Sequence, residues 1–322
     1  MGKSSTKRGS VAYWHRSRAH RMTPRVRGWI NHQKGLEGLV GYKAGMTSVQ
    51  YVDDSDSPTK GQEIVEAATI IEIPKHFVYS ITLLGHNSTG LVVLTEVNAT
   101  NAPKFASRSI TPAKKSDLSV LDKFASKASQ VRVKLITAPE STGLGKKTPE
   151  IIEVPVGGAD VKAKLEYAKS ILGKELSVTD ILTEGEFVDA IAVTHGKGWQ
   201  GVVKRYGVAL NTHKSSKAVR HGGSIGPERQ GKVMFTIPRA GQMGFHRRTD
   251  KAKRVMMISS DVSAINPVDG FVHYGMVKAS YILVQGSVPG PRKRAIILRK
   301  TVKKIQPRKP QIKEINKDSK QG

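Results

Sequence analysis

The 322-residue sequence contains no cysteine. This absence excludes disulfides, cysteine-ligated zinc fingers, thiol nucleophiles and iron–sulfur clusters. Long apolar runs are missing too: none approaches the roughly 20 residues that a membrane-spanning helix needs. The basic N-terminus lacks the apolar stretch that would follow it in a signal peptide. We therefore expect a soluble, cytoplasmic protein with no membrane association.

Acidic residues are scarce, above all in three segments of the chain. The chain has 53 Lys and Arg against 26 Asp and Glu, a formal charge of +27. Residues 1–34 contain nine cations and no acid, residues 195–254 fourteen against two, and residues 290–322 twelve against two. Basic segments on a near-neutral body are typical of nucleic-acid-binding proteins. A basic peripheral membrane protein is the alternative, but these segments lack the continuous apolar helix face that it requires.

Regular periodicity is absent from residues 195–254, where neither a strand pattern nor a long helical pattern recurs. This stretch contains ten glycines, and four aromatic residues lie among its cations: Trp199, Tyr206, Phe235 and Phe245. Lys and Arg neutralise phosphates, while aromatic faces accept unstacked bases. A disordered basic linker is the alternative, although the interleaved aromatics and glycine turns argue against it. The pattern predicts a long loop that becomes ordered on RNA.

The remaining sequence has the texture of short strands separated by turns, with two helices in its middle part. Strands are predicted at 38–52 (as two, turning at Lys43–Gly45), 65–73, 77–84, 91–97, 131–136, 187–194, 255–258, 271–277, 281–284 and 295–298. Helices are predicted at 116–129 and after Asp160, where Val161, Leu165, Ala168 and Leu172 keep helical spacing.

These elements predict a mainly β protein with an α/β insert. We expect a basic N-terminal arm (1–37), a small closed antiparallel β-barrel (38–75 and 187–299, with the basic loop at 195–254), the insert (76–186) and a basic C-terminal tail (300–322). The barrel is thus expected to be assembled from two distant parts of the chain. Phe271, Tyr274 and Tyr281 are expected to lie in its core.

Two glycine-rich motifs suggest nucleotide enzymes, but neither is complete. Gly196–Gly201 matches G-x-G-x-x-G, yet the first acid after it is Glu228, too far away to hold a ribose. The segment ending in Lys146-Lys147-Thr148 fails as a phosphate loop, because Glu140 occupies its first glycine position and Lys147 its hydroxyl position. We predict no catalytic residue and no cofactor.

Four histidines lie in the basic stretch, at His195, His213, His221 and His246. Their spacing is irregular and the surrounding cations oppose a divalent ion, so no metal site is predicted. Trp14 and Trp199 lie outside any apolar pattern, next to cations and small residues. For each, stacking on RNA and fastening an arm to the protein's own body remain alternatives.

The predicted RNA-contacting residues come from all three basic segments. They are Lys3, Lys7, Arg8, Trp14, Arg16, Arg18, Arg21, Arg25, Arg27, Lys197, Trp199, Lys204, Arg205, Lys214, Lys217, Arg220, His221, Arg229, Lys232, Arg239, Gln242, His246, Arg247, Arg248, Lys251, Lys253, Arg254, Arg292, Lys293 and Arg294.

Six stretches carry a resemblance to a known family. They are GSVAYWHRSRAHRMTPRVRGW at 9–29, GLVGYKAGMT at 38–47, THGKGWQGVVKRYG at 194–207, RAGQMGFHRRT at 239–249, GFVHYG at 270–275 and GSVPGPRKR at 286–294. Together they resemble the universal large-subunit ribosomal protein L three, in its archaeal and eukaryotic form. The resemblance covers nearly the whole chain, whereas residues 76–186 match only in position and texture.

The resemblance implies a barrel of the kind found in translation factors, interrupted by an α/β insert. It also implies early assembly into the large subunit, contacts with ribosomal RNA and neighbouring ribosomal proteins, and a basic loop that extends towards the peptidyl transferase centre. One position departs from the pattern: Glu228 stands where archaeal and eukaryotic members usually have a tryptophan at the loop tip.

We therefore interpret the chain as a structural, non-catalytic RNA-binding protein of the large ribosomal subunit, with no small-molecule substrate. Two alternatives stay open on the residues alone. A nucleotide-dependent enzyme built on Gly196–Gly201 requires stabilisation by dinucleotides. A free RNA chaperone or chromatin-type protein would not sediment with ribosomal subunits at high salt.

Overall fold

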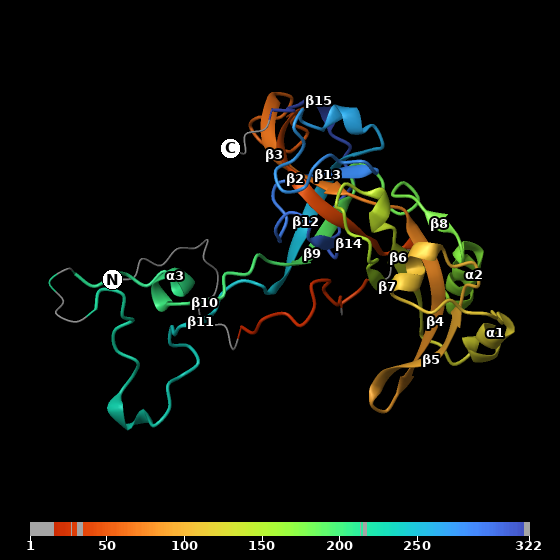
Figure 1. Ribbon diagram of the computed structural model, residues 1–322, viewed down its shortest axis with the longest axis horizontal. Coiled ribbons are helices and arrows are strands. Elements are labelled where there is room, and N and C mark those ends of the chain that lie inside the picture. The colour runs from red at the N-terminus through yellow and green to blue at the C-terminus, as the bar shows by residue number, and fades with distance from the viewer. Residues whose placement is uncertain (1–15, 27, 31–34, 213, 215–217, 319–322) are drawn as a thin grey trace. The chain divides into compact units, whose positions relative to one another are not determined.

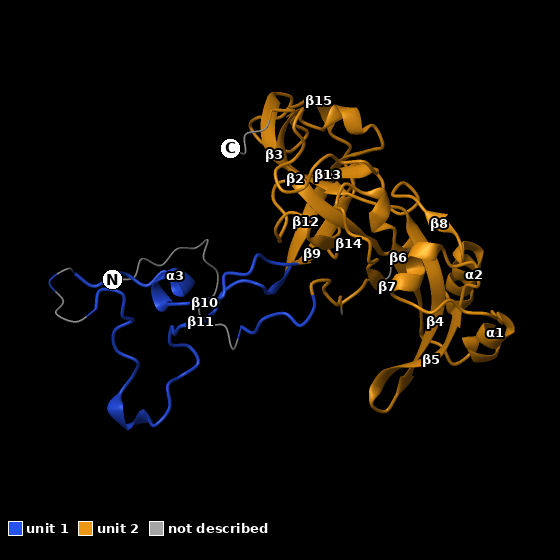
Figure 2. Cartoon of the chain, viewed as in Figure 1, with its two compact units in different colours: residues 1–21, 193–248 blue, residues 22–192, 249–322 orange. Residues whose placement is uncertain are grey.

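The computed structural model (Figure 1) describes residues 16–26, 28–30, 35–212, 214 and 218–318. The chain divides into two compact units (Figure 2): residues 1–21 with 193–248 form unit 1, and residues 22–192 with 249–322 form unit 2. Of the predicted RNA contacts, six lie outside the described residues: Lys3, Lys7, Arg8, Trp14, Arg27 and Lys217.

The larger of the two main sheets has seven strands. In spatial order these are β14 (Ala295–Lys300), β9 (Phe187–Val193), β12 (Arg247–Ser259), β13 (Tyr281–Gln285), β3 (Glu63–Glu72), β2 (Gly38–Val52) and β15 (Gln311–Ile315). β14 also pairs with β2, so β14 has a hydrogen-bonded neighbour on each side. The strands come from both ends of the chain, as the turn-separated apolar segments predicted.

The second sheet holds most of the middle of the chain. Its spatial order is β1 (Gly35–Leu36), β7 (Ile151–Gly157), β6 (Gln130–Thr137), β4 (His76–Asn87) and β5 (Gly90–Asn98), and β8 (Glu175–Leu176) pairs with β4. Two α-helices lie in the same part of the chain, α1 (Ser119–Ala125) and α2 (Val161–Ile171). In α2, Leu165 and Ala168 are buried as the helical spacing predicted.

The remaining elements are short. They are the 3-10 helices η2 (Lys104–Arg108), η3 (Pro139–Ser141), η4 (Glu228–Gln230) and η5 (Val262–Ala264), the strands β10 (Trp199–Gln200) and β11 (Gly241–Gln242), and the helix α3 (Val202–Tyr206). No helix in the described part of the chain is long and apolar enough to cross a membrane.

One hydrophobic core serves both main sheets of unit 2. Its buried side chains include Leu39 and Ile70 from the seven-stranded sheet and Val78 and Leu135 from the other. Tyr281 lies fully buried in it, as predicted, and Phe271 and Tyr274 are buried as well. Because β-branched and leucine side chains dominate the inward positions of these strands, burying them supplies the main driving force for folding.

Four segment predictions were wrong. The loop predicted to extend to residue 254 ends earlier, because β12 begins at Arg247. Gly38–Val52 is one strand, because the turn-like Lys43–Gly45 is absorbed as a register shift in its pairing with β3. The helix predicted at 116–129 is confined to Ser119–Ala125. The strand predicted at 271–277 is a turn, in which His273 and Gly275 have φ angles of 62° and 97° that a strand does not allow.

A buried carboxylate explains how that turn is held. Glu72, on β3, accepts hydrogen bonds from the Tyr274 hydroxyl at 2.5 Å and from the amides of Lys278 and Ala279 at 2.6 and 2.7 Å. It also accepts one from the amide of Gly143 at 3.1 Å. A buried polar group is tolerated only when it is hydrogen-bonded. Through these bonds Glu72 fixes two loops against the sheet.

The C-terminal segment is more structured than a basic tail. β15 pairs with the outer half of β2 through Gln311↔Val52 to Ile315↔Val49. Before it, the Arg308 amide donates to the carbonyl of Gly185 at 3.1 Å, and Lys309 pairs with Glu184 at 2.7 Å. Alternation is short in QIKEI, so the sequence pattern did not predict this strand.

His76 makes folding depend on pH. It is fully buried at the start of β4, with its Nε2 atom 2.9 Å from the carbonyl oxygen of Val40. Burial lowers its pKa from 6.5 to about 4, against the opposing effect of the bond to Val40. The unfolded chain therefore binds a proton that the folded chain rejects as pH falls.

We expect the contribution of His76 to be fully present above pH 6.5 and to be lost as the pH falls from about 6.5 to about 4. The loss is about 3 kcal/mol of unfolding free energy. Urea unfolding at several pH values in this range gives the unfolding free energy of wild type and of His76→Gln. The free energy of wild type should fall more steeply with decreasing pH, and the difference measures the contribution of His76. His86→Gln, at an exposed position of the same strand, is the control. Equal pH dependence for His76→Gln and wild type would contradict the assignment.

Candidate nucleic-acid interface

The described part of unit 1 is built on a short antiparallel frame. Trp199 pairs with Gln242, and Gln200 with Gly241. The frame continues through backbone bonds of 2.9 Å from the Lys197 amide to Met243 and from the Met243 amide back to Gly198. Two stretches that both resemble loop sequence thus hold each other in place, which local periodicity does not reveal.

Glycines lie where the two segments of the frame come closest, and at Gly244 no other residue fits. Gly244 has a φ of 70°, and a Cβ placed there would lie 2.1 Å from the carbonyl oxygen of His195. A Cβ on Gly241 would lie 2.7 Å from Nη1 of Arg205. At these two positions, therefore, the glycines of the basic stretch serve internal packing.

The segment at 16–19 lies against this frame. The Ala19 amide donates to the carbonyl of Phe245 at 2.8 Å, and Nδ1 of His246 donates to the carbonyl of Ser17 at 3.0 Å. Burial lowers the pKa of His246, and nearby arginines lower it further, against the opposing effect of the bond to Ser17. His246 therefore contributes a neutral hydrogen-bond donor to the frame.

Arg205 and Arg16 flank the ring of Tyr206. Their guanidinium carbons lie 5.1 and 5.6 Å from its centroid, within the range of cation–π attraction. Arg205 also donates to the carbonyls of Gln242 at 3.1 Å and Arg239 at 2.8 Å. These two predicted RNA contacts therefore help to hold the N-terminal segment to the loop. The sequence placed Tyr206 among the aromatics whose faces accept bases, but it did not predict that two arginines of this chain lie over its ring.

Most other predicted contacts in unit 1 are exposed. These exposed residues are Arg18, Arg21, Lys197, Trp199, Lys204, Lys214, Arg220, His221, Arg229, Lys232, Arg239, Arg247 and Arg248. Gln242 is partly buried and donates to the carbonyl of Gly244 at 3.0 Å. These exposed cations lie in a segment with almost no acidic residue, since Glu228 is the one acid in 193–248.

Beyond the frame, the loop is held by few contacts. Among the described residues between Gly207 and Ala240, η4 is the one regular element. The Asn211 amide bonds to Val219 at 3.0 Å, and Glu228 opens η4 between Gly226 and Gly231, whose φ angles are 124° and 63°. Exposed backbone and high positive charge give this stretch little internal reason to hold its shape.

Unit 2 contains the other described contacts that were predicted. Arg25, Lys251 and Lys293 are exposed, whereas Arg292 and Arg294 are partly buried. Lys253 is partly buried too and pairs with Asp250 at 3.0 Å.

Arg254, also predicted to contact RNA, lies inside the protein. Its side chain is 7% exposed and binds both oxygens of Asp54, at 2.7 and 2.5 Å. It also donates to the carbonyl of Arg308 at 2.9 Å. Because its donors are used within the chain, Arg254 supports the fold of unit 2.

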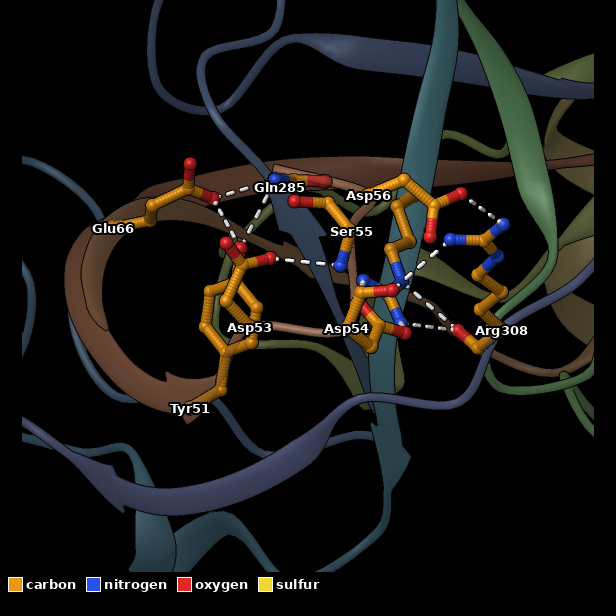
Figure 3. Close-up of polar contacts among 9 residues, drawn as sticks. Tyr51, Asp53, Asp54, Ser55, Asp56, Glu66, Gln285 and Arg308 are labelled. Atoms are coloured by element: carbon orange, nitrogen blue, oxygen red, sulfur yellow. Dashed lines mark hydrogen bonds and ion pairs between the residues drawn. The ribbon is translucent and has the colours of Figure 1, made fainter. Parts of the chain in front are cut away.

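Figure 3 shows the polar network around this ion pair. Asp53 accepts bonds from the Ser55 amide and from the hydroxyls of Ser57 and Thr59, which hold its pKa well below the usual range. Glu66 accepts from Tyr51 at 3.0 Å and from Gln285 at 2.5 Å. Each of these carboxylates already has donors within the chain, so the network fastens the β2–β3 turn.

A lysine holds the basic loop at 286–294. The ammonium group of Lys43, in the bulge of β2, donates to the carbonyls of Val288 at 2.9 Å and Gly290 at 3.3 Å. Burial lowers its pKa, and so does the nearby charge of Arg292. The backbone of Lys43 also pairs with that of Lys293 and Arg294. The loop's cations are therefore presented on a fixed backbone, through a residue that sequence reasoning missed.

The nucleotide-enzyme motif has the wrong structure. α3 follows Gly196–Gly201 directly, which the sequence did not predict, but it has five residues against the full helix that a dinucleotide fold needs. Lys146, in the other motif, pairs with Glu150. Within the residues that can be described, no group of three or more His, Asp or Glu is arranged to hold a metal ion.

Comparisons of the sequence with known proteins identify its family. The family model described as ribosomal protein L3 matches residues 2–322. The large ribosomal subunit protein uL3 of Methanococcus vannielii is 43% identical, over 100% of this chain and 99% of that protein. Those of Methanobrevibacter smithii and Methanocaldococcus jannaschii are also 43% identical, over 98% of this chain and 98% and 97% of theirs. The chain therefore belongs to the ribosomal protein L3 family.

Proposed function

We propose that this protein binds large-subunit ribosomal RNA as a structural, non-catalytic constituent of the large ribosomal subunit. Membership of the L3 family supplies the subunit and the cytoplasmic ribosome as its location. The observation that carries RNA binding is the exposed cationic surface of unit 1, on a backbone frame that is already hydrogen-bonded. Cations next to the frame, such as Lys197, can neutralise phosphates without first ordering their own backbone, whereas the loop beyond the frame is expected to become ordered on RNA.

The pairing pattern supports a closed barrel. We infer that β14, β9, β12, β13, β3 and β2 form a ring, because β14 pairs with β9 and also with β2. Closure would remove two unpaired edges. The proposed boundaries are those predicted from sequence, namely an arm at 1–37, the barrel at 38–75 and 187–299 and an insert at 76–186. The segment after residue 300 is not a free tail, because β15 pairs with β2.

Within the subunit, we propose that the RNA contacts come from the exposed cations of unit 1, from Arg25 and Lys251, and from the 292–294 loop. The family resemblance supports the further proposal that the loop extends towards the peptidyl transferase centre and that the protein joins the subunit early, beside other large-subunit proteins. Because Glu228 stands where family members usually have a tryptophan, we propose for this protein no role that depends on that tryptophan.

Changing four exposed loop cations to glutamine tests phosphate binding. In a variant with Lys204, Arg220, Arg229 and Lys232 replaced, we expect the logarithm of RNA affinity to fall less steeply with the logarithm of salt concentration. The slope should change by roughly 0.7–0.9 for each phosphate that the variant no longer neutralises. The four residues are exposed, so folding should be unaffected.

A matched variant carries the same charge change elsewhere. Lys104, Lys114, Lys115 and Lys123 are also exposed and lie in the proposed insert. Replacing them with glutamine should leave the salt slope of binding to protein-free large-subunit RNA close to the wild-type value. Identical slopes for the loop variant and wild type would overturn the proposed interface.

A further inference from the structure

Trp199 is exposed on a backbone that does not move freely. Its side chain is 76% exposed, although its main chain pairs with Gln242 in the β10–β11 frame. Gln200, next to it, donates to the carbonyl of Lys197 at 2.6 Å. An indole ring buries more apolar surface than almost any other side chain when it is covered. A fixed but uncovered tryptophan is therefore an interaction site with its conformational cost already met.

The two other tryptophans do not share this arrangement. Trp29 is partly buried and packs against the core of unit 2, and Trp14 lies outside the described residues. Tyr206, the aromatic residue nearest in sequence, already has two guanidinium groups over its ring. Among the described residues, nothing covers the Trp199 side chain, so within this part of the chain it does not fasten an arm to the protein body.

Gly201 gives a second, independent indication of a close neighbour. Its φ of −71° is ordinary for any residue, and a Cβ built there would meet no heavy atom within 4 Å. Neither strain nor internal packing therefore requires glycine, in contrast to Gly244. A glycine with no internal reason, two residues from an uncovered indole, fits a ligand that approaches the backbone closely.

The charge of the surroundings identifies the kind of ligand. Residues 193–248 contain eleven Lys and Arg and one acid. Lys197 and Lys204 are exposed on either side of Trp199 in sequence. A cationic or neutral protein surface gains nothing from such cations, whereas a nucleotide offers an aromatic base for the indole and a phosphate for the lysines.

We propose that Trp199 stacks on an unpaired nucleobase of ribosomal RNA, with Gly201 leaving room for the same nucleotide or the next one. This inference rests on the proposed function and specifies the RNA: an unstacked base in a loop, bulge or single strand, because bases within a duplex have no free face. Stacking tolerates any base, so it contributes affinity without a sequence requirement.

The test measures affinity for protein-free large-subunit RNA, for single-stranded RNA and for a duplex of the same length. Trp199→Ala should bind the first two roughly 5- to 150-fold more weakly than wild type, as expected when one stack is removed. Duplex binding and the salt slope should not change, because stacking releases no counterions. Trp199→Phe, which keeps an aromatic face, should recover most of the affinity.

Gly201→Ser distinguishes an effect on nucleotide binding from an effect on the stability of the fold. Serine is a better residue than glycine at the start of a helix, so the melting temperature should stay the same or rise. RNA affinity should nevertheless fall, because a side chain now occupies the space beside the indole. Unchanged affinity in Gly201→Ser would show that Gly201 is not part of the site. Stacking by Trp199 would then be decided by the Trp199 variants.

The outcomes distinguish this inference from the proposed function. If wild type binds RNA with a steep salt slope and Trp199→Ala binds equally well, stacking is overturned while RNA binding stands. If wild type binds no RNA, the proposed function itself fails. If Trp199→Ala binds RNA normally but is depleted from large subunits, a neighbouring protein covers the indole and the inference is also overturned.

Discussion

Replacing Arg254 with glutamine is expected to destabilise the fold by roughly 2–4 kcal/mol. The substitution removes both bonds to Asp54 and leaves the Arg308 carbonyl without its main donor, in a place that is almost closed to water. Asp54 remains partly exposed, so water offsets some of the destabilisation. The shift in the urea unfolding midpoint, with the slope held constant, measures the change.

Lys251→Gln is the matched control for this experiment. It lies three residues away on β12 and removes the same charge, but its side chain is exposed. We expect its stability to stay within about 0.5 kcal/mol of wild type. If the two variants are equally stable, the ion pair between Arg254 and Asp54 contributes nothing to the unfolding free energy. The sequence-based prediction that Arg254 contacts RNA would then be favoured.

Deleting residues 211–235 and joining the ends with a few glycines should barely affect the fold. The frame of β10, β11 and Arg205 lies outside the deletion. Loop closure entropy changes only slowly with length, by roughly 0.6 kcal/mol for each doubling. The melting temperature of the purified protein should therefore remain within a few degrees of the wild-type value.

The same deletion should be severely damaging in the cell. It removes five of the loop's Lys and Arg together with two histidines: Lys214, Lys217, Arg220, Arg229, Lys232, His213 and His221. Large subunits should either stall in assembly or assemble and transfer peptides slowly, since the RNA around the loop would lose its counter-charge. Subunit yield and peptide-transfer rate, with the deleted protein as the sole copy, distinguish these outcomes. Normal values for both would show the loop to be dispensable.

Local pattern was sufficient to predict most of the fold. The β-branched segments became strands, and the spacing of Leu165 and Ala168 gave α2. The errors arose where distant groups decide the structure. The turn at 271–275 depends on Glu72, about 200 residues earlier, and β15 depends on the free edge of β2. Neither dependence can be detected in a local window.

The position of the candidate interface was predictable from composition. Which of its cations are exposed and which support the fold was not. Lys251 and Arg254 look alike in sequence, and burial of one depends on Asp54, which lies 200 positions away. Arg205 and His246 also hold the frame together, through partners that only the folded chain brings near. Charge clustering thus predicts where a nucleic-acid surface lies. Contacts within the folded chain decide which of its cations hold the protein structure together instead of facing solvent.

Sedimentation at high salt tests the central claim most directly. We predict that the protein remains with large ribosomal subunits after washing at salt concentrations that remove proteins bound only through exposed charges, because many phosphate contacts are combined with stacking and with a fixed frame. Recovery of the protein in the free fraction, with intact subunits lacking it, would contradict the account and favour a free RNA chaperone.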